Sequence, residues 1–136
     1  MASVHLQSAS GFVQQIQARS HQLRADEPLD NGGTDSGPAP YELLLAGLAA
    51  CTSLTLRMYA DRKQWELGLI DVRLRFSRDE QGREKIDRTV AFGAALSEVQ
   101  IGRLAEICEK TPVTKTIRQG TPIATTLQQT RLEIDS

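Results

Sequence analysis

Aromatic residues and excess charge are both scarce in this chain of 136 residues. Only 4% of its residues are Phe, Trp or Tyr, and 16 basic residues stand against 17 acidic ones, which gives a formal net charge of −1. Proteins bind nucleic acids and anionic membranes mainly through clustered Lys and Arg, and they bind single-stranded nucleic acid also through stacked aromatic rings. The composition therefore gives no reason to expect nucleic acid or a membrane as a partner.

The sequence shows no visible signal peptide, and we expect no membrane-spanning segment. Residues 1–10 have neither a basic head nor an apolar core. The longest apolar run, Leu43 to Cys51, is far shorter than the roughly 20 residues that span a bilayer. We therefore expect a cytoplasmic protein, in which thiols stay reduced. The two cysteines and two histidines are far apart along the chain, and this spacing indicates no metal site and no cofactor.

The pattern of polar and apolar residues in the first half predicts strands, a long loop and a helix. Residues 3–8, 11–18 and 20–24 are predicted as short strands, of which the first two form a hairpin. Gly, Pro, Asn and Asp crowd residues 26–40, which is typical of a loop. A helix is predicted over residues 40–63, with Pro40 as its first residue. Because its first four turns are apolar almost all round, we expect this helix to be buried on most faces.

The second half predicts a hairpin, two helices and a strand. Residues 69–76 and 86–96 alternate between apolar and polar side chains, which favours two half-buried strands around a charged turn at 77–85. One helix is predicted from its N-cap Ser97 to a point before Pro112, and a short helix from Thr111 to Gly120. Residues 122–134 are predicted as a final strand. The order indicates one α+β domain, residues 1–136, with helices gathered on one face of an antiparallel sheet.

Two cysteines are candidates for chemistry. Cys51 lies in the apolar helix, and Cys108 lies on the inner face of the helix that follows Ser97. A cysteine in such a position is more often an inert packing residue than a nucleophile, so each has a structural interpretation beside the reactive one. If the fold brings the two thiols together, the pair can attack a substrate and close a disulfide, which would make the protein a redox enzyme.

Two stretches of the sequence resemble a known family. The first contains Gly32-Gly33 and Gly37-Pro-Ala-Pro-Tyr-Glu-Leu-Leu-Leu-Ala-Gly-Leu-Ala-Ala-Cys-Thr52, and the second is Thr111-Pro-Val-Thr-Lys-Thr-Ile117. Both are similar to motifs of the osmotically inducible protein C and organic hydroperoxide resistance family (OsmC/Ohr). The resemblance extends over nearly the whole chain.

The resemblance implies an OsmC-like fold, in which antiparallel sheets wrap around a buried central helix in an intertwined homodimer. It also implies an active site at the subunit interface. There a first cysteine reduces organic hydroperoxides, a second cysteine closes a disulfide, and a dithiol reductant such as a lipoylated protein reopens that disulfide. An arginine from an N-terminal strand and a glutamate before the helix usually activate the first cysteine in this family.

This chain has the first cysteine of the family pattern, but it departs from the pattern in that no sharp motif fixes the activating arginine. Cys51 matches the first cysteine directly. Arg19 and Arg24 are both candidates for the activating arginine, and we prefer Arg19. His21 is a candidate for part of the cationic environment, although as a lone histidine it is more simply interpreted as a strand residue.

The chain departs from the family pattern at two other positions. Thr111 stands where the second cysteine is usual, and Cys108 lies three residues earlier, which is about one helical turn away. Because the Cα atoms of a disulfide lie within about 7 Å of each other, a bridge from Cys108 to the first cysteine would need some rearrangement. Tyr41 stands at the position of the glutamate and is followed by Glu42. These departures are more similar to the OsmC-like branch of the family.

The resemblance therefore implies a thiol-dependent peroxidase that reduces organic hydroperoxides. Cys51 would attack the peroxide, Arg19 or Arg24 would stabilise the thiolate, and Cys108 would resolve the oxidised sulfur, unless an external thiol does so. The alternative is a non-enzymatic protein of the same fold, with a role in stress response or in binding a small ligand. The absent glutamate and the displaced second cysteine favour that alternative.

Overall fold

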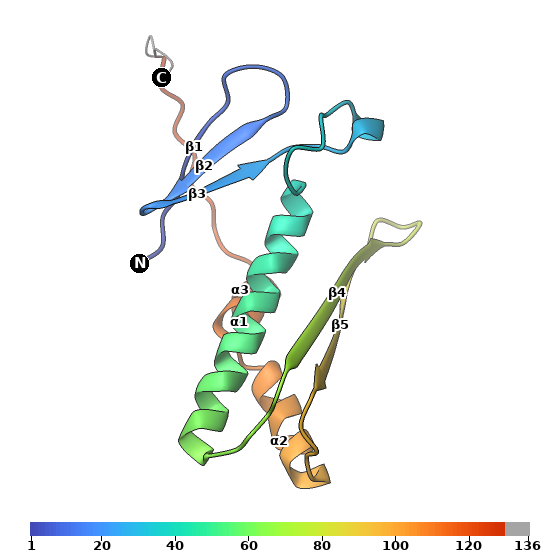
Figure 1. The fold of residues 1–136 in the computed structure, drawn as a ribbon. Coiled ribbons are helices and arrows are strands. Elements are labelled where there is room, and N and C mark those ends of the chain that lie inside the picture. The colour runs from blue at the N-terminus through green and yellow to red at the C-terminus, as the bar shows by residue number, and fades with distance from the viewer. Residues whose placement is uncertain (130–136) are drawn as a thin grey trace. The chain divides into compact units, whose positions relative to one another are not determined.

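The computed structural model describes residues 1–129, and the chain divides into two compact units (Figure 1). The N-terminal unit comprises Met1–Leu43 and the described residues from Ile123 onward, and the helical unit comprises Leu44–Pro122. The elements are, in chain order, β1 (His5–Gln7), β2 (Gln14–Ala18), β3 (His21–Ala25), a 3-10 turn (Leu29–Asn31), α1 (Pro40–Lys63), β4 (Ile70–Arg78), β5 (Glu84–Phe92), α2 (Glu98–Cys108) and α3 (Pro112–Gln119).

In the N-terminal unit, β1, β2 and β3 form an antiparallel sheet, which confirms the predicted hairpin and third strand. Leu6, Ile16 and Leu23 are partners in register across the three strands, so they form one row on the same face. Leu6 and Leu23 are about half exposed, at 48% and 46%. This apolar face is therefore only partly covered within the chain.

The loop after β3 is folded around the carboxylate of Asp26. This buried side chain accepts hydrogen bonds from the backbone N–H groups of Glu27, Thr34 and Ser36 and from the hydroxyls of Thr34 and Ser36, at 2.6–3.2 Å. The bond from the Thr34 hydroxyl, followed by those from Ser36, holds the pKa of Asp26 far below its usual range. One carboxylate thus fixes the course of the segment that leads into α1.

The helix α1 has the bounds that the sequence predicts, Pro40–Lys63. The expectation that it is buried on most faces is wrong for the single chain, because its buried residues form one stripe. They are Leu48, Thr52, Leu56 and Ala60. Leu54 and Met58, in contrast, are 57% and 60% exposed. The other elements of the chain cover one side of α1 and leave an apolar side open.

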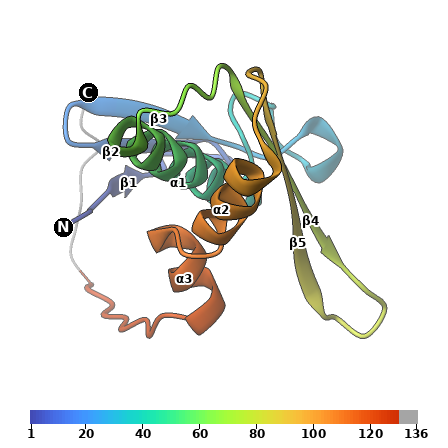
Figure 2. The same ribbon diagram turned by 90° about the horizontal axis from the view of Figure 1, so that it is seen from below.

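In the helical unit, β4 pairs with β5 along its full length, from Ile70 opposite Phe92 to Arg78 opposite Glu84. The turn is shorter than predicted, because residues 77, 78, 84 and 85 belong to the strands, and β5 ends at residue 92 rather than 96. Figures 1 and 2 both show α2 between α1 and the hairpin. The buried core of this unit consists of Leu56, Ala60, Leu67, Leu104 and Cys108.

The two short helices begin where the sequence predicts. The Ser97 side chain caps α2 by accepting from the backbone N–H of Gln100, and the Gln100 side chain accepts from the backbone N–H of Ser97, which completes a capping box. The helix α3 begins at Pro112, directly after Thr111. The Thr111 hydroxyl does not cap α3 but shares a 2.6 Å hydrogen bond with the hydroxyl of Thr114.

The described residues form two antiparallel sheets, β1–β2–β3 and β4–β5, which agrees with the predicted α+β class. One prediction about the strands is wrong. Residues 122–129 form no strand, and the rest of the predicted final strand, 130–134, lies outside the described residues. The apolar side chains of Ile123 and Leu127 are 88% and 93% exposed. An alternating pattern forms a strand only where a neighbouring strand accepts its hydrogen bonds, and residues 122–129 pair with none.

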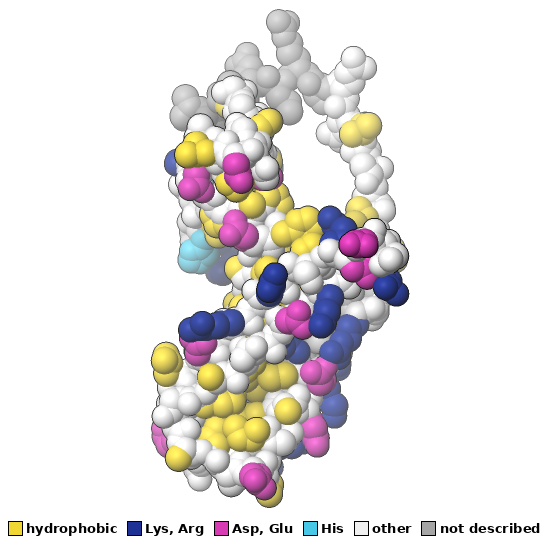
Figure 3. All heavy atoms as spheres, turned by 90° about the vertical axis from the view of Figure 1, so that its right-hand side faces the viewer, with side chains coloured by type: hydrophobic (Ala, Val, Ile, Leu, Met, Phe, Trp, Pro, Cys, Tyr) yellow, Lys and Arg dark blue, Asp and Glu magenta, His cyan; other side chains and the backbone are white. Residues whose placement is uncertain are grey.

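The surface reflects the balanced charge of the sequence. Figure 3 shows acidic and basic side chains interspersed on one face of the molecule. On the hairpin, Arg78 pairs with Glu84 at 2.6 Å and Lys85 with Asp87 at 3.1 Å. By length and composition alone α1 is apolar enough to cross a membrane. Because helices that pack inside proteins pass the same test, this does not assign the chain to a membrane.

Candidate functional site

Cys51 lies midway along α1 at the border between the buried stripe and the open side. The residue is half-buried, and its Sγ lies 4.0 Å from Oγ1 of Thr55, one turn further along the helix. Gly47, one turn before Cys51, has no side chain, and a Cβ atom built there would meet nothing within 4 Å. In the single chain, the surface of α1 beside this thiol is therefore open.

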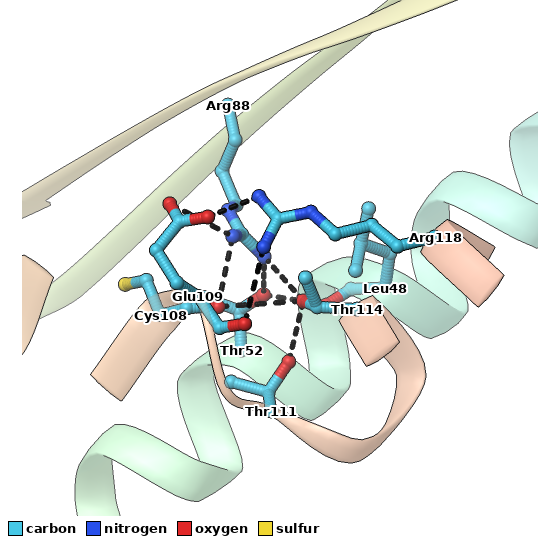
Figure 4. Close-up of polar contacts among 8 residues, drawn as sticks. All are labelled: Leu48, Thr52, Arg88, Cys108, Glu109, Thr111, Thr114 and Arg118. Atoms are coloured by element: carbon cyan, nitrogen blue, oxygen red, sulfur yellow. Dashed lines mark hydrogen bonds and ion pairs between the residues drawn. The ribbon is translucent and has the colours of Figure 1, made fainter. Parts of the chain in front are cut away.

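A buried guanidinium lies next to the residue that follows Cys51. Arg88 comes from β5, and its side chain is only 12% exposed. Figure 4 shows how it joins three segments: Nη1 donates to Oγ1 of Thr52 at 3.0 Å and to Oγ1 of Thr114 at 2.9 Å, and Nη2 donates to the backbone O of Cys108 at 2.9 Å. One side chain thus fixes α1, the end of α2 and the start of α3 to the hairpin.

The polar groups around Arg88 are also bonded to one another. The Thr52 hydroxyl donates to the backbone O of Leu48 at 2.7 Å, and the hydroxyls of Thr111 and Thr114 share a hydrogen bond. Thr52 and Thr111 have no exposed surface, and Thr114 is 5% exposed. Buried hydroxyls are stable only when they have such partners. The network is therefore a fixed part of the fold beside Cys51.

The charge of Arg88 is balanced only in part. Glu109 is the nearest carboxylate, with Oε1 at 3.9 Å from Nη2 of Arg88, and its other oxygen accepts a short hydrogen bond from Arg118. That bond from Arg118 lowers the pKa of Glu109, and Arg88 adds to the effect. Two guanidinium groups thus share one carboxylate, which leaves the cluster with a net positive charge.

Cys108 contributes its backbone, but not its sulfur, to this network. Figure 4 shows the sulfur pointing away from the guanidinium of Arg88. The side chain belongs to the core, with Leu56 and Ala60 of α1, and burial raises the pKa of its thiol. Both cysteines are free thiols. The structure therefore places Cys108 as a core residue beside the network.

The other residues predicted for the site lie in the N-terminal unit or at the start of α1. Arg19 is exposed in the two-residue turn between β2 and β3, where its backbone is left-handed with φ 54°. His21 and Arg24 are exposed residues of β3. Tyr41 is 49% exposed in the first turn of α1, and the Glu42 carboxylate accepts from the backbone N–H of Ala39 at 2.8 Å. The carboxylate of Glu42, a residue that the sequence predicted for the site, therefore caps the start of α1.

Sequence reasoning missed Arg88, although a signal for it exists. The side chains of β5 that lie on the inner face are those of Ile86, Arg88, Val90 and Phe92, in strict alternation. An arginine at an inward position of an otherwise apolar row must find buried partners. This pattern predicts a buried polar network, but the sequence does not identify its partners, which lie 20 to 36 residues away.

Among residues 1–129, no group of three or more His, Cys, Asp or Glu side chains is arranged to hold a metal ion. What the helical unit offers instead is one half-buried thiol on a long helix, and the mostly buried guanidinium of Arg88 bonded to the next residue of that helix. The nucleophile that this arrangement offers is the sulfur of Cys51.

The model of the OsmC-like protein family matches residues 33–126, well over half of the sequence. The chain therefore belongs to the OsmC-like protein family, and the resemblance found in the sequence is confirmed. No protein of curated function matches the sequence.

Solved structures share the fold at low sequence identity. An OsmC-like protein from Mycoplasma pneumoniae is 18% identical, with a TM-score of 0.69 and coverage of 87% of each chain. The organic hydroperoxide resistance protein OhrB of Bacillus subtilis is 24% identical, with a TM-score of 0.60 and coverage of 87% of this chain and 90% of that one. An organic hydroperoxide resistance protein OsmC from Legionella pneumophila is 16% identical, with a TM-score of 0.64 and coverage of 87% and 89%. At these identities the likeness establishes the fold.

Proposed function

We propose that the protein is a thiol-dependent peroxidase that reduces organic hydroperoxides at Cys51. The Cys51 thiolate attacks the distal oxygen of the hydroperoxide, the O–O bond breaks, and the alkoxide leaves and takes up a proton to become the alcohol. The sulfur is thereby oxidised to a sulfenic acid. A dithiol reductant, such as a lipoylated protein, then returns it to the thiol and is itself oxidised to a disulfide, with release of water.

The position of Cys51 is the observation that carries this proposal. The thiol is half-buried at the edge of an open helix side, and the next residue, Thr52, is held by the buried guanidinium of Arg88. A nucleophile needs both access and a fixed direction, and this arrangement supplies both. The names of the similar proteins from Bacillus subtilis and Legionella pneumophila, which are organic hydroperoxide resistance proteins, support the same substrate class.

The remaining roles follow the family pattern. We assign to Arg19 the stabilisation of the Cys51 thiolate and of the departing alkoxide, because its exposed guanidinium is available for a bound anion. His21 adds a second basic group on β3. Tyr41 and Glu42, in the first turn of α1, are proposed to contact the substrate. We expect the protein to act in the cytoplasm, where its thiols stay reduced.

The proposal includes a homodimer. The open side of α1 carries Gly47, Ala50, Leu54 and Met58 at helical spacing, and all four are exposed in the single chain. Small residues allow another helix to approach closely, and an apolar stripe on one helix can pack on the same stripe of a second copy around a two-fold axis. A second copy would cover Leu54 and Met58, which are 57% and 60% exposed in the single chain.

A non-enzymatic role is the second candidate, and one observation favours it. Thr111 and Tyr41 stand where the family has a cysteine and a glutamate, and Thr111 is fully buried in a hydrogen-bonded network. A protein with this fold and a weakly reactive Cys51 would bind a small ligand, or act in a stress response, without turnover.

A single-turnover experiment separates the two functions. Reduced protein is mixed with cumene hydroperoxide or with hydrogen peroxide, and the remaining free thiols are counted over time. We expect thiol loss at Cys51 that is at least about tenfold faster with the organic peroxide, because the surface beside the thiol is apolar. The Cys51→Ser variant should keep the fold and lose peroxide turnover. Turnover that survives in Cys51→Ser, or an absence of thiol loss in the native protein, would contradict the peroxidase.

A further inference from the structure

The backbone of Cys108 is held in place by two donors. Its carbonyl oxygen accepts from Nη2 of Arg88 at 2.9 Å and from the hydroxyl of Thr114 at 3.4 Å. Arg88 is at the same time bonded to Thr52 of α1, so the end of α2 cannot shift along α1 without breaking buried, charge-assisted hydrogen bonds. The turn between α2 and α3 is therefore fixed to the helix that carries Cys51.

The two sulfurs lie on different sides of α1. Cys108 packs in the core that includes Leu56 and Ala60, and its sulfur points away from the guanidinium (Figure 4). Successive residues of an α-helix are about 100° apart, so Leu56, five residues after Cys51, lies about 140° around the helix axis from it. Cys51 instead borders the open side of α1, next to Gly47. A disulfide requires the two Cα atoms to come within about 7 Å, with side chains directed at each other.

We propose that Cys51 works without a resolving cysteine in its own chain, that Cys108 is a structural core residue, and that an external dithiol resolves oxidised Cys51. This proposal depends on the proposed function in one respect only, which is that an organic hydroperoxide is the oxidant of Cys51.

The chemistry of this step is balanced without Cys108. The first thiol of the dithiol attacks the sulfenic sulfur of Cys51, which forms a mixed disulfide and releases water. The second thiol of the same molecule attacks that mixed disulfide, which restores the Cys51 thiol and leaves the reductant as a cyclic disulfide. The two electrons that reduced the hydroperoxide to an alcohol thus come from the dithiol, and Cys108 remains a thiol throughout.

Peptide mapping of the full-length protein tests the proposal. Reduced protein is treated with one equivalent of cumene hydroperoxide, in the presence or absence of dimedone, which traps sulfenic acids, and is then digested and analysed by mass spectrometry. We expect the loss of one thiol per chain, a dimedone adduct at Cys51, and an unmodified Cys108. A peptide that contains Cys51 disulfide-bonded to Cys108 of the same chain would overturn the proposal.

A variant and a second oxidant complete the test. Cys108→Ala should retain turnover with dihydrolipoamide within about twofold of the native rate, whereas a tenfold loss in a folded variant would assign Cys108 to the reaction. If Cys108→Ala does not fold, the peptide map of the native protein decides. If cumene hydroperoxide oxidises neither thiol, the peroxidase fails but the proposal is still tested with diamide, which couples neighbouring thiols. If diamide forms no disulfide between Cys51 and Cys108, the result supports the conclusion that the two sulfurs are apart. A rapid Cys51–Cys108 disulfide would refute that conclusion.

Discussion

Removal of Arg88 is the sharpest test of how this fold holds its site. The side chain is 12% exposed and donates three hydrogen bonds, to Thr52, to Thr114 and to the backbone of Cys108. A hydrogen bond to a charged group contributes about 1.5–3 kcal/mol, but burial of the guanidinium itself costs several kcal/mol, part of which the substitution returns. We therefore expect Arg88→Met to lower the free energy of unfolding by about 2–4 kcal/mol.

Urea unfolding measured by tryptophan fluorescence is a suitable assay, because Trp65 is the single tryptophan and packs against Tyr59 in the helical unit, with ring centroids 5.5 Å apart. Arg118→Met is the matched control. It removes the outer arginine, whose pair with Glu109 is more than half exposed on both sides, and should cost at most about 1 kcal/mol. Equal and small effects of the two substitutions would refute the reasoning that the buried hydrogen bonds of Arg88 fix the helices.

Three further predictions concern the loop before α1 and the open side of α1. Asp26→Asn should lower the thermal midpoint at neutral pH. Because the folded pKa of Asp26 lies below its ordinary value of 3.8, the stability that Asp26 confers is complete above about pH 4 and is lost as the pH falls further. The thermal midpoints of the native protein and of Asp26→Asn should therefore converge in acid. A constant difference between these midpoints down to about pH 2 would argue against the hydrogen-bonded carboxylate. Gly37→Ala should destabilise the N-terminal unit and accelerate proteolysis there, because the new Cβ would lie 2.4 Å from the backbone O of Arg24. Gly82→Ala at the hairpin turn is the control, because a Cβ there meets nothing within 4 Å and the substitution tests the effect of a positive φ of 82° alone. Leu54→Glu should convert a homodimer into monomers in light scattering, because it puts a charge on the exposed apolar stripe of α1; a native protein that is already monomeric would contradict the proposed dimer.

Local signals in the sequence predict much of this fold. The start of α1 follows from Pro40, and the start of α2 follows from Ser97 and Gln100, because capping depends on residues within one turn. The hairpin β4–β5 follows from alternation within each strand. The prediction of a final strand was wrong for residues 122–129, because an alternating pattern does not indicate whether a partner strand is present.

The sequence by itself determined the family, the helix that carries Cys51, and the absence of a second cysteine at position 111, because these depend on residue identity and spacing along the chain. Only the tertiary structure decided that Arg88 holds Thr52, Thr114 and Cys108 together, that the Cys108 sulfur belongs to the core, and that one side of α1 stays open. These features depend on contacts between segments far apart in the sequence. Packing between these segments determines which partners a buried guanidinium has. It also determines which side of a uniformly apolar helix is covered.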